Sequence, residues 1–290
     1  MAYEIKPLNV SEILDQAVQL VRTRFLTLMA IALILYVPID LWRGLLVISN
    51  LEKIGSINSH MTPREMTQWF LSRGRSSTPL QHVVTWLTIL IFTPLCSAAM
   101  AHAVSTEYLN IPASVKDSIL TGLRKLPSIL WTNLILILVL FGVGIASALI
   151  IGVVAAVAGP VSVILVVIVV ILVFYLLLRL SLLTTTIVIE SESGLSAFER
   201  SSQLMTGHFS QALVLGLILA LMRMIVATFG LLDLLIPLPM VRVVAQSLVD
   251  GILMCYASTV FVIFYYSCRC QLDHFDLTTL AESVKEPRTK

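Results

Sequence analysis

No charged residue and no histidine lies between Lys125 and Arg179. About 20 apolar residues, rising 1.5 Å each, cross the ~30 Å hydrocarbon core of a bilayer, so this run is long enough for two membrane-spanning helices. Gly159 and Pro160 lie near its middle, where glycine tolerates a turn and proline cannot continue the hydrogen-bond ladder of a helix. The sequence therefore predicts a helical hairpin with spans at residues 128–158 and 161–183.

The composition of the whole chain agrees with a membrane environment. Hydrophobic residues make up 58% of the sequence and charged residues 12%, whereas about a quarter of the residues in soluble proteins are charged. The net charge of +2 is spread over loops and ends and forms no basic patch, which argues against nucleic-acid binding. We therefore expect an integral membrane protein whose contacts are with lipid rather than with nucleic acid.

Apolar segments along the chain predict an all-α, polytopic fold with six transmembrane helices in one membrane domain, residues 1–271. A polar tail of residues 272–290 follows on the cytoplasmic side. The predicted spans are residues 25–48, 80–104, 128–158, 161–183, 209–236 and 241–266.

A short amphipathic stretch precedes each pair of spans. Residues 9–23 carry charge on one face only, and further stretches of this kind begin at Ser114 and Ser196. An amphipathic helix that leads into a span would lie along the membrane surface. The order suggests an internal threefold repeat of interfacial helix plus hairpin, although any six-span protein with short loops looks periodic.

The basic residues outside the predicted spans set the orientation. Most of them fall on the cytoplasmic side if the N-terminus is cytoplasmic, in keeping with the excess of Lys and Arg in cytoplasmic loops. The basic loop of residues 50–79 would lie on the other side and weakens this assignment. We expect both termini in the cytoplasm.

Four charged residues within the predicted spans are the candidate functional residues, because a charge in the bilayer needs a partner or a purpose. Arg223 precedes Pro237 by about as many residues as Asp250 follows it, so the two reach similar depths in an antiparallel hairpin. They could form a polar site for a substrate headgroup or a coupling proton, or they could join the two helices as an ion pair.

Asp40 and Arg43 allow the same two interpretations. They lie three residues apart, on one face of the first predicted span, and Pro38 should kink the helix just before them. A broken helix in a membrane often lines a binding site, which favours a functional reading, whereas an ion pair within the helix would be structural.

No pattern typical of an enzyme occurs in the sequence. The five histidines lack metal-ligand spacing, and there is no nucleophile elbow, phosphate-binding loop or dinucleotide fingerprint. Gly142, Gly144 and Gly152 suit close helix packing better than phosphate binding. We expect no catalytic residue, no metal and no cofactor, which leaves only an unfamiliar intramembrane chemistry open. The four cysteines are expected to be free thiols.

Three segments of the C-terminal third carry a further pattern. They are Thr186–Glu190; Leu195–Gly207, with Phe198, Glu199-Arg200-Ser201, Leu204 and Gly207; and the closing stretch from Tyr265-Tyr266 through Arg269 to Phe275-Asp276-Leu277. Together they resemble the membrane domain that is fused to some bacterial glycerophosphoryl diester phosphodiesterases and also occurs alone. The first half of the chain is similar to that family only in topology.

Two departures limit what this resemblance implies. The family often has proline where Thr184 to Thr186 stand, and no soluble phosphodiesterase domain is present in this sequence. The activity of the fused enzyme is therefore not carried over. What the resemblance implies is a stand-alone member with the fold and topology of that domain, in the bacterial cytoplasmic (inner) membrane.

The sequence supports two main hypotheses for function. The first is a non-enzymatic scaffold or subunit that engages membrane lipids and partner proteins, or further copies of itself. The second is a small transporter or lipid-handling protein in which Asp40, Arg43, Arg223 and Asp250 line a polar path. The two differ in whether these side chains point into a continuous cavity or into closed helix contacts.

Overall fold

The computed structural model describes residues 8–54, 62, 64, 79–109, 111, 113–159, 161–229 and 239–273. The regular structure in these ranges consists of α-helices and one π-helical turn, with no β-strand among them. The all-α fold class is thus confirmed. Residues 274–290 of the predicted polar tail and most of the 50–79 loop lie outside the described residues.

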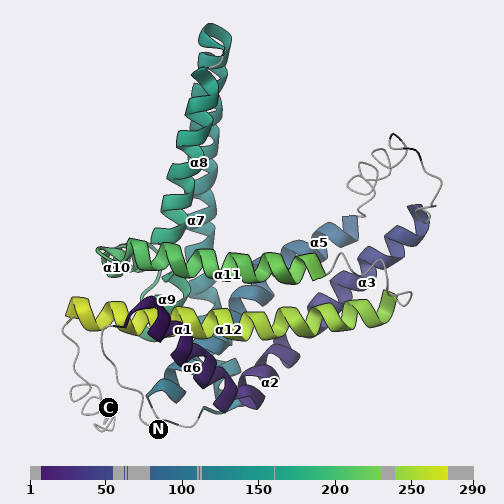
Figure 1. Ribbon diagram of the computed structural model, residues 1–290, viewed down its shortest axis with the longest axis vertical. Coiled ribbons are helices and arrows are strands. Elements are labelled where there is room, and N and C mark those ends of the chain that lie inside the picture. Colours follow the sequence, from purple (N-terminus) through teal and green to yellow (C-terminus); the bar gives the residue numbers. More distant parts are fainter. Residues whose placement is uncertain are drawn as a thin grey trace.

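The helices follow one another along the chain, and several of them are separated by only one to a few residues (Figure 1). The first half of the chain forms α1 (Val10–Thr23), α2 (Phe25–Leu35), α3 (Val37–Ile54), α5 (Pro79–Leu87), the π-helix η1 (Thr88–Phe92) and α6 (Thr93–Tyr108). The second half forms α7 (Val115–Ala158), α8 (Val161–Arg179), α9 (Leu183–Glu190), α10 (Leu195–Met205), α11 (Phe209–Phe229) and α12 (Pro239–Asp273).

Five helical stretches are long and apolar enough to cross a membrane, and a bent pair of helices would make a sixth. The bent pair is α1 with α2, which turn by 81° at Arg24. The five stretches are His82–Tyr108, Val115–Ala155, Ser162–Glu190, Phe209–Ala227 and Val243–Leu272. The chain therefore has the architecture of a membrane protein with several spans.

The first predicted span, residues 25–48, differs from the expectation. The helix is interrupted at Tyr36, between α2 and α3, so that no single helix covers this range. The cause is Pro38, whose ring clashes with the carbonyl group four residues earlier and whose nitrogen has no hydrogen to donate. The sequence predicted a kink here, and the structure has a break.

The second interfacial helix is also different from the expectation. Residues 115–126 do not form a separate helix but are the first turns of α7, which continues through Pro127 to Ala158. With 44 residues, α7 is about 66 Å long, more than twice the ~30 Å thickness of a hydrocarbon core. Its first turns therefore extend beyond the part that a bilayer can cover.

The helices form two units that lie crosswise to each other (Figure 1). The antiparallel hairpin of α7 and α8 stands away from the rest, and α11 and α12 run together across its base. The buried core lies below the hairpin, where α1, α2, α6, α9 and α12 pack together. The side chains that fill it include small ones such as Ala98 and Ala99, aromatic ones such as Tyr265, and many aliphatic ones.

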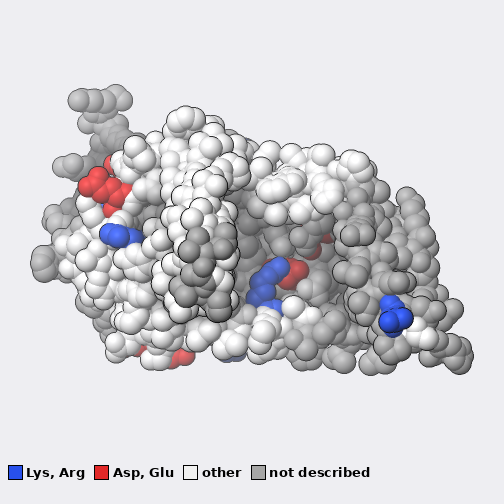
Figure 2. All heavy atoms as spheres, turned by 90° about the horizontal axis from the view of Figure 1, so that it is seen from above, with Lys and Arg blue, Asp and Glu red and all other residues white. Residues whose placement is uncertain are grey.

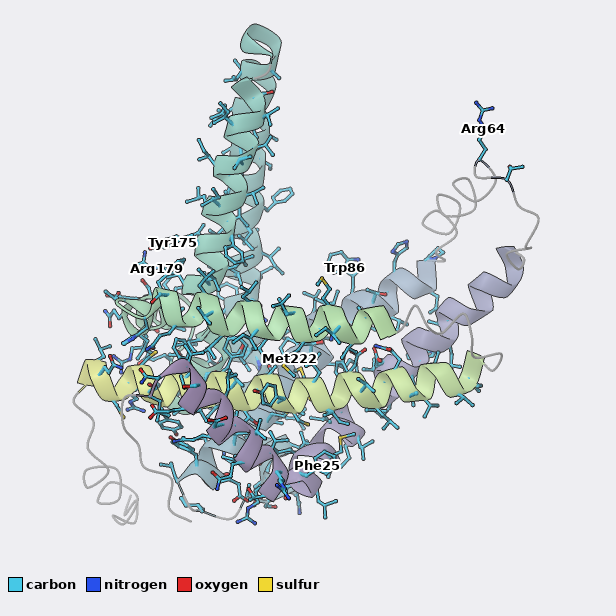
Figure 3. All side chains as sticks on the ribbon, viewed as in Figure 1. Phe25, Arg64, Trp86, Tyr175, Arg179 and Met222 are labelled. Carbon is cyan, nitrogen blue, oxygen red and sulfur yellow. The ribbon has the colours of Figure 1, made fainter. Side chains whose placement is uncertain are left out.

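The hairpin itself buries almost no surface within the chain. None of the residues in the most apolar part of Val115–Ala155, and 6% of those in the most apolar part of Ser162–Glu190, are buried. Seen along the hairpin, charged atoms are few on the surface (Figure 2). Tyr175 and Arg179 lie near the base, where the hairpin meets the level of α11 (Figure 3). An apolar surface of this kind requires lipid chains or another protein around it.

Glycine allows α6 and α7 to approach closely at one position. A Cβ atom on Gly122 would lie 3.2 Å from the backbone nitrogen of Ala99 and from the carbonyl oxygen of Leu95. At Gly142, Gly144 and Gly152 no atom lies within 4 Å of the equivalent point. The packing role expected for these three glycines is therefore not observed within the chain, and Gly122 has it instead.

We expect Gly122→Val to destabilise the protein by about 1–3 kcal/mol, because a larger side chain would push against backbone rather than against a flexible side chain. Thermal unfolding of the purified protein in detergent measures this effect. Gly144→Val in the same helix is the matched control and should leave the melting temperature unchanged. Equal melting temperatures for the two variants would contradict the close α6–α7 contact.

Candidate functional site

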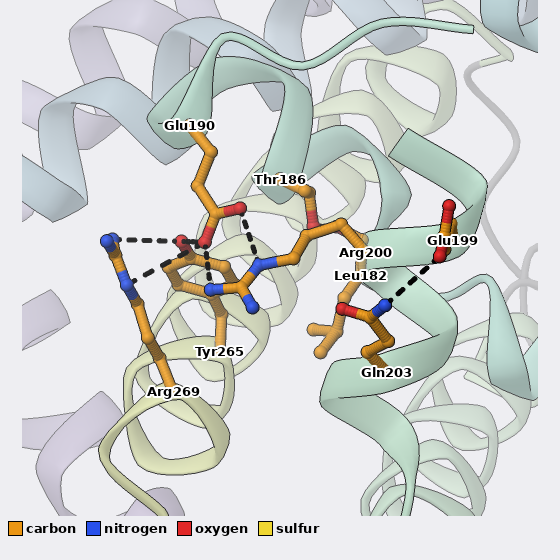
Figure 4. Close-up of polar contacts among 8 residues, drawn as sticks. All are labelled: Leu182, Thr186, Glu190, Glu199, Arg200, Gln203, Tyr265 and Arg269. Carbon is orange, nitrogen blue, oxygen red and sulfur yellow. Dashed lines mark hydrogen bonds and ion pairs between the residues drawn. The ribbon is translucent and has the colours of Figure 1, made fainter. Parts of the chain in front are cut away.

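The most connected polar group that the structure describes is the carboxylate of Glu190, the last residue of α9 (Figure 4). It accepts hydrogen bonds from Arg200, whose Nε and Nη2 lie 2.8 and 3.1 Å away, and from the Tyr265 hydroxyl at 2.7 Å. The Nε of Arg269 lies 3.7 Å from the same carboxylate. One acidic side chain thus joins α9, α10 and α12.

The turn between α9 and α10 places Arg200 over Glu190. Ser191 ends α9 in the left-handed region with φ 65°, and Gly194 begins α10 with φ 64°, a region that favours glycine. The backbone N–H of Gly194 donates to Thr132 Oγ1 at 2.9 Å, which attaches the turn to α7. The chain therefore reverses sharply beside the base of the hairpin.

On α12, Tyr265 and Arg269 are four residues apart and share one face of the helix. The Arg269 guanidinium donates to the Tyr265 hydroxyl at 3.2 Å, and that hydroxyl in turn donates to Glu190. The ring of Tyr265 packs edge-on against Tyr266, with ring centroids 5.3 Å apart, and Tyr266 stacks on Tyr108 at 5.4 Å. The Glu190 cluster is thereby connected to the core at α6.

An open hollow of about 570 Å³ lies beside the Glu190 cluster. Glu192 and Glu199 are exposed on its wall, and Glu199 accepts a hydrogen bond from Gln203 at 3.3 Å. The other lining residues are Ile189, Glu190, Ser196, Arg200, Gln203 and Arg269. Because acidic and basic side chains both line the hollow, it can bind a polar group.

The Glu190 cluster was not among the residues that the sequence singled out as a site. Glu190 and Arg269 lie near the ends of apolar segments, and Arg200 lies in an amphipathic helix, and charged residues are usual at both kinds of position. Residues of the three segments that resemble the membrane domain of glycerophosphoryl diester phosphodiesterases meet in this cluster. That resemblance was the signal in the sequence that could have indicated the cluster.

The predicted proximity of Arg223 and Asp250 is present in the structure. Arg223 Nη1 lies 3.1 Å from Asp250 Oδ1, and Gln246 Nε2 donates to Asp250 Oδ2 at 3.3 Å. The two partners differ sharply in exposure, since 58% of the Arg223 side chain but only 5% of the Asp250 side chain is accessible. A groove of about 320 Å³ runs beside the pair, and its walls are otherwise mainly apolar.

Asp40 has a partner that the sequence did not suggest. The hydroxyl of Ser247 donates to Asp40 Oδ2 at 2.8 Å, and both residues are buried between α3 and α12. The side chain of Arg43 lies outside the described residues, so the predicted relation of Asp40 to Arg43 stays a prediction. Asp40 is not among the residues that line the groove beside Arg223 and Asp250.

A further ion pair connects α6 to the junction of α1 and α2. Arg24 Nε lies 2.8 Å from Glu107 Oε2, and the backbone N–H of Ala113 donates to the other carboxylate oxygen at 3.0 Å. Here too the acid is buried and the arginine is half exposed.

The described residues contain no group of three or more His, Cys, Asp or Glu side chains that could hold a metal ion. The four cysteines are free, as expected.

No family model, no curated protein and no solved structure matches the chain. The resemblance to the membrane domain of glycerophosphoryl diester phosphodiesterases therefore stays a prediction from three segments.

We expect Glu190→Gln to lower the free energy of unfolding by about 2–3 kcal/mol. The change leaves two guanidinium groups facing each other without a carboxylate, and breaking a fully buried ion pair costs about 3–5 kcal/mol. The loss should be smaller than that maximum because Arg200 and Arg269 are 22% and 21% exposed. Unfolding in mixed micelles measures it. Glu192→Gln, at an exposed position of the same hollow, should have no effect, and equal losses would contradict this role of Glu190.

A double-mutant cycle tests the pair on α11 and α12. Arg223→Ala should destabilise more than Asp250→Ala, because it leaves a buried carboxylate with Gln246 as its remaining donor. The coupling free energy should be on the order of 1 kcal/mol, reduced by the exposure of Arg223. Melting curves of the two single variants and the double variant in detergent provide the measurement. Strictly additive losses would show that the two residues do not interact.

Proposed function

We propose that the protein is a non-enzymatic integral membrane scaffold or subunit that engages lipid through its apolar hairpin and partner proteins through the hollow beside Glu190. Its proposed location is the bacterial cytoplasmic membrane, with both termini in the cytoplasm. The partners would be other membrane proteins or further copies of the chain. The resemblance of the C-terminal third supports this location, and the surfaces described above support the mode of action.

One observation carries this proposal: the buried carboxylates of Asp40, Glu107 and Asp250, and the mostly buried carboxylate of Glu190, are each used in a contact between helices. Glu190 joins α9, α10 and α12; Asp250 joins α12 to α11; Asp40 joins α3 to α12. Within a bilayer such contacts hold helices together, because lipid chains are as apolar as the side chains. The acidic groups are thus engaged in maintaining structure, which is what a scaffold requires.

Residues at the base of the hairpin are of the types that favour a membrane boundary next to the hollow. Trp131 and Tyr175 are 59% and 40% exposed there, and the Arg179 guanidinium lies 6.0 Å from the centre of the Tyr175 ring. Tryptophan, tyrosine and arginine side chains are typical of the membrane–water interface. Glu199 lines the hollow and also a second cavity that includes Arg179, so the hollow would open beside the headgroups. A partner at the membrane surface could reach it.

The alternative is a small transporter or lipid-handling protein. A polar path is not favoured, because Asp40 is buried against Ser247 and does not line the groove beside the Arg223–Asp250 pair. Lipid handling retains one specific observation in its favour. The groove beside Arg223 has mainly apolar walls and a single exposed cation, which suits an amphiphile better than a water-filled pathway.

Recovery of partners from native membranes tests the scaffold function. The tagged full-length protein, expressed at its natural level and extracted in lipid nanodiscs, should bring down at least one membrane protein in a stoichiometric amount. Glu192→Lys should reduce that recovery about fivefold or more, because reversal of an exposed charge at a docking surface introduces repulsion. Quantitative mass spectrometry of the eluates provides the measurement.

Asp15→Lys, an exposed charge reversal on α1, is the matched control and should recover the partner at the wild-type level. The scaffold proposal would be wrong if the wild-type protein recovered no protein above the level of an unrelated membrane protein. Equal recovery by wild type and Glu192→Lys would remove the hollow as the docking surface.

A further inference from the structure

The groove between α11 and α12 has the form of a binding site for an amphiphile. Its volume of about 320 Å³ lies at the lower end of the range for ligand pockets, which is about 300–1,000 Å³. Leu219, Ala220 and Phe261 contribute to a wall that is predominantly apolar. Charge enters the lining at one place, where Arg223 meets Asp250. On the face seen in Figure 2, basic and acidic atoms lie together in a hollow near the middle of the view, and further charged atoms lie toward the edges.

The two side chains of this ion pair differ in exposure and in how much of their hydrogen-bonding capacity is used. The Asp250 carboxylate is 5% exposed, and each of its oxygens accepts a hydrogen bond, from Arg223 and from Gln246. Arg223 is 58% exposed and uses Nη1 for this contact, although a guanidinium has five N–H donors in a planar arrangement. Most of its hydrogen-bonding capacity therefore remains directed away from Asp250.

In a membrane, the exposed surface of Arg223 would be in contact with lipid rather than with water. A guanidinium in the hydrocarbon region is costly unless an anion or water reaches it. Arginine is also the side chain best suited to phosphate, which it binds in a bidentate manner. The combination of an apolar groove and one exposed guanidinium therefore matches a phospholipid, which has an apolar chain and one phosphodiester.

The position of Arg223 along α11 permits this contact. Arg223 lies 14 residues after Phe209, or about 21 Å along the helix axis, which leaves about 9 Å to the far boundary of a ~30 Å core if α11 crosses upright. An arginine side chain extends toward the nearer interface and shortens that gap. If α11 instead lies along the surface, as its crosswise direction to the hairpin allows, the headgroups are nearer still.

We propose that this groove binds one phospholipid from the surrounding membrane, with the phosphodiester on the Arg223 guanidinium and an acyl chain between α11 and α12. The proposal goes beyond the proposed function, in which the α7–α8 hairpin engages lipid, and does not involve the partner hollow beside Glu190. A second helix in the groove would leave Arg223 without an anion. A free phosphate ion would leave the apolar wall unoccupied.

Native mass spectrometry of the purified full-length protein tests the proposal. The protein in dodecyl maltoside is titrated with three probes: a phosphatidylglycerol, a diacylglycerol with the same acyl chains, and inorganic phosphate. The expected result is one bound phosphatidylglycerol per chain and at least tenfold weaker binding of the other two, because each lacks one of the two contacts. Equal binding of diacylglycerol and phosphatidylglycerol would overturn the role of Arg223, and binding of inorganic phosphate alone would overturn the role of the apolar wall.

Two variants address the two halves of the site separately. Arg223→Gln should weaken phosphatidylglycerol binding about tenfold or more. Ala220→Phe should weaken it as well, by filling the groove while leaving Arg223 in place, and it adds only an apolar side chain at an exposed position, so it remains informative if Arg223→Gln does not fold. Wild-type affinity in both variants would overturn the proposal.

Matched controls are available for each variant. Arg24→Gln removes another half-exposed arginine that is paired with a buried carboxylate, but at the α1–α2 junction. Val214→Phe enlarges an exposed position of α11 that is not part of the groove. Both controls should bind phosphatidylglycerol like the wild type, and a loss as large as that of Arg223→Gln would show that binding is not specific to the groove. Partner recovery by Arg223→Gln from native membranes should be unchanged, which separates a failure of this proposal from a failure of the scaffold function.

Discussion

The carboxylate of Glu190 joins α9, α10 and α12 beside the base of the α7–α8 hairpin. It holds Arg200 of α10 and Tyr265 of α12 at hydrogen-bonding distance, although these residues are far from each other in the sequence. The adjacent turn is attached to α7 through Gly194 and Thr132. The base of the apolar hairpin and the end of the longest helix of the core are therefore positioned by one small set of polar contacts, and the hollow beside Glu190 exists because of them.

This arrangement follows from the way a bilayer changes the driving forces. Lipid chains solvate leucine and valine as well as a protein interior does, so apolar burial alone does not decide which helices associate. Close approach of small residues and hydrogen bonds between helices then become decisive. The structure shows both: α6 presents a row of buried alanines and approaches α7 at Gly122, while α12 is joined to its neighbours through Tyr265, Asp250 and Ser247. The hairpin has neither kind of contact along most of its length and correspondingly stands apart.

The features that the sequence predicted well depend on nearby residues or on similar spacing from a turn. The uncharged run around Gly159 indicated two adjacent apolar helices, and the equal spacing of Arg223 and Asp250 from Pro237 indicated two charges at one depth. The features that it missed depend on contacts between distant segments. Ser247 carries no charge and lies far from Asp40 in the chain, so nothing local marks it as a partner. Small residues such as Gly142 and Gly144 show where a helix could be approached, but they do not show whether another helix is there.

The exposure of the arginine beside an apolar groove distinguishes the Arg223–Asp250 pair from the Glu190 cluster. At Glu190 both arginines are about one-fifth exposed, and one of them lies against the carboxylate with two donors, as expected for a contact that holds helices together. At Asp250 the acid is 5% exposed, against 12% for Glu190, but 58% of the Arg223 side chain is exposed. A purely structural ion pair gains nothing from an exposed cation at the edge of an apolar groove. Because exposure of a guanidinium in a membrane is costly, its presence beside that groove is best explained by a ligand that carries its own negative charge.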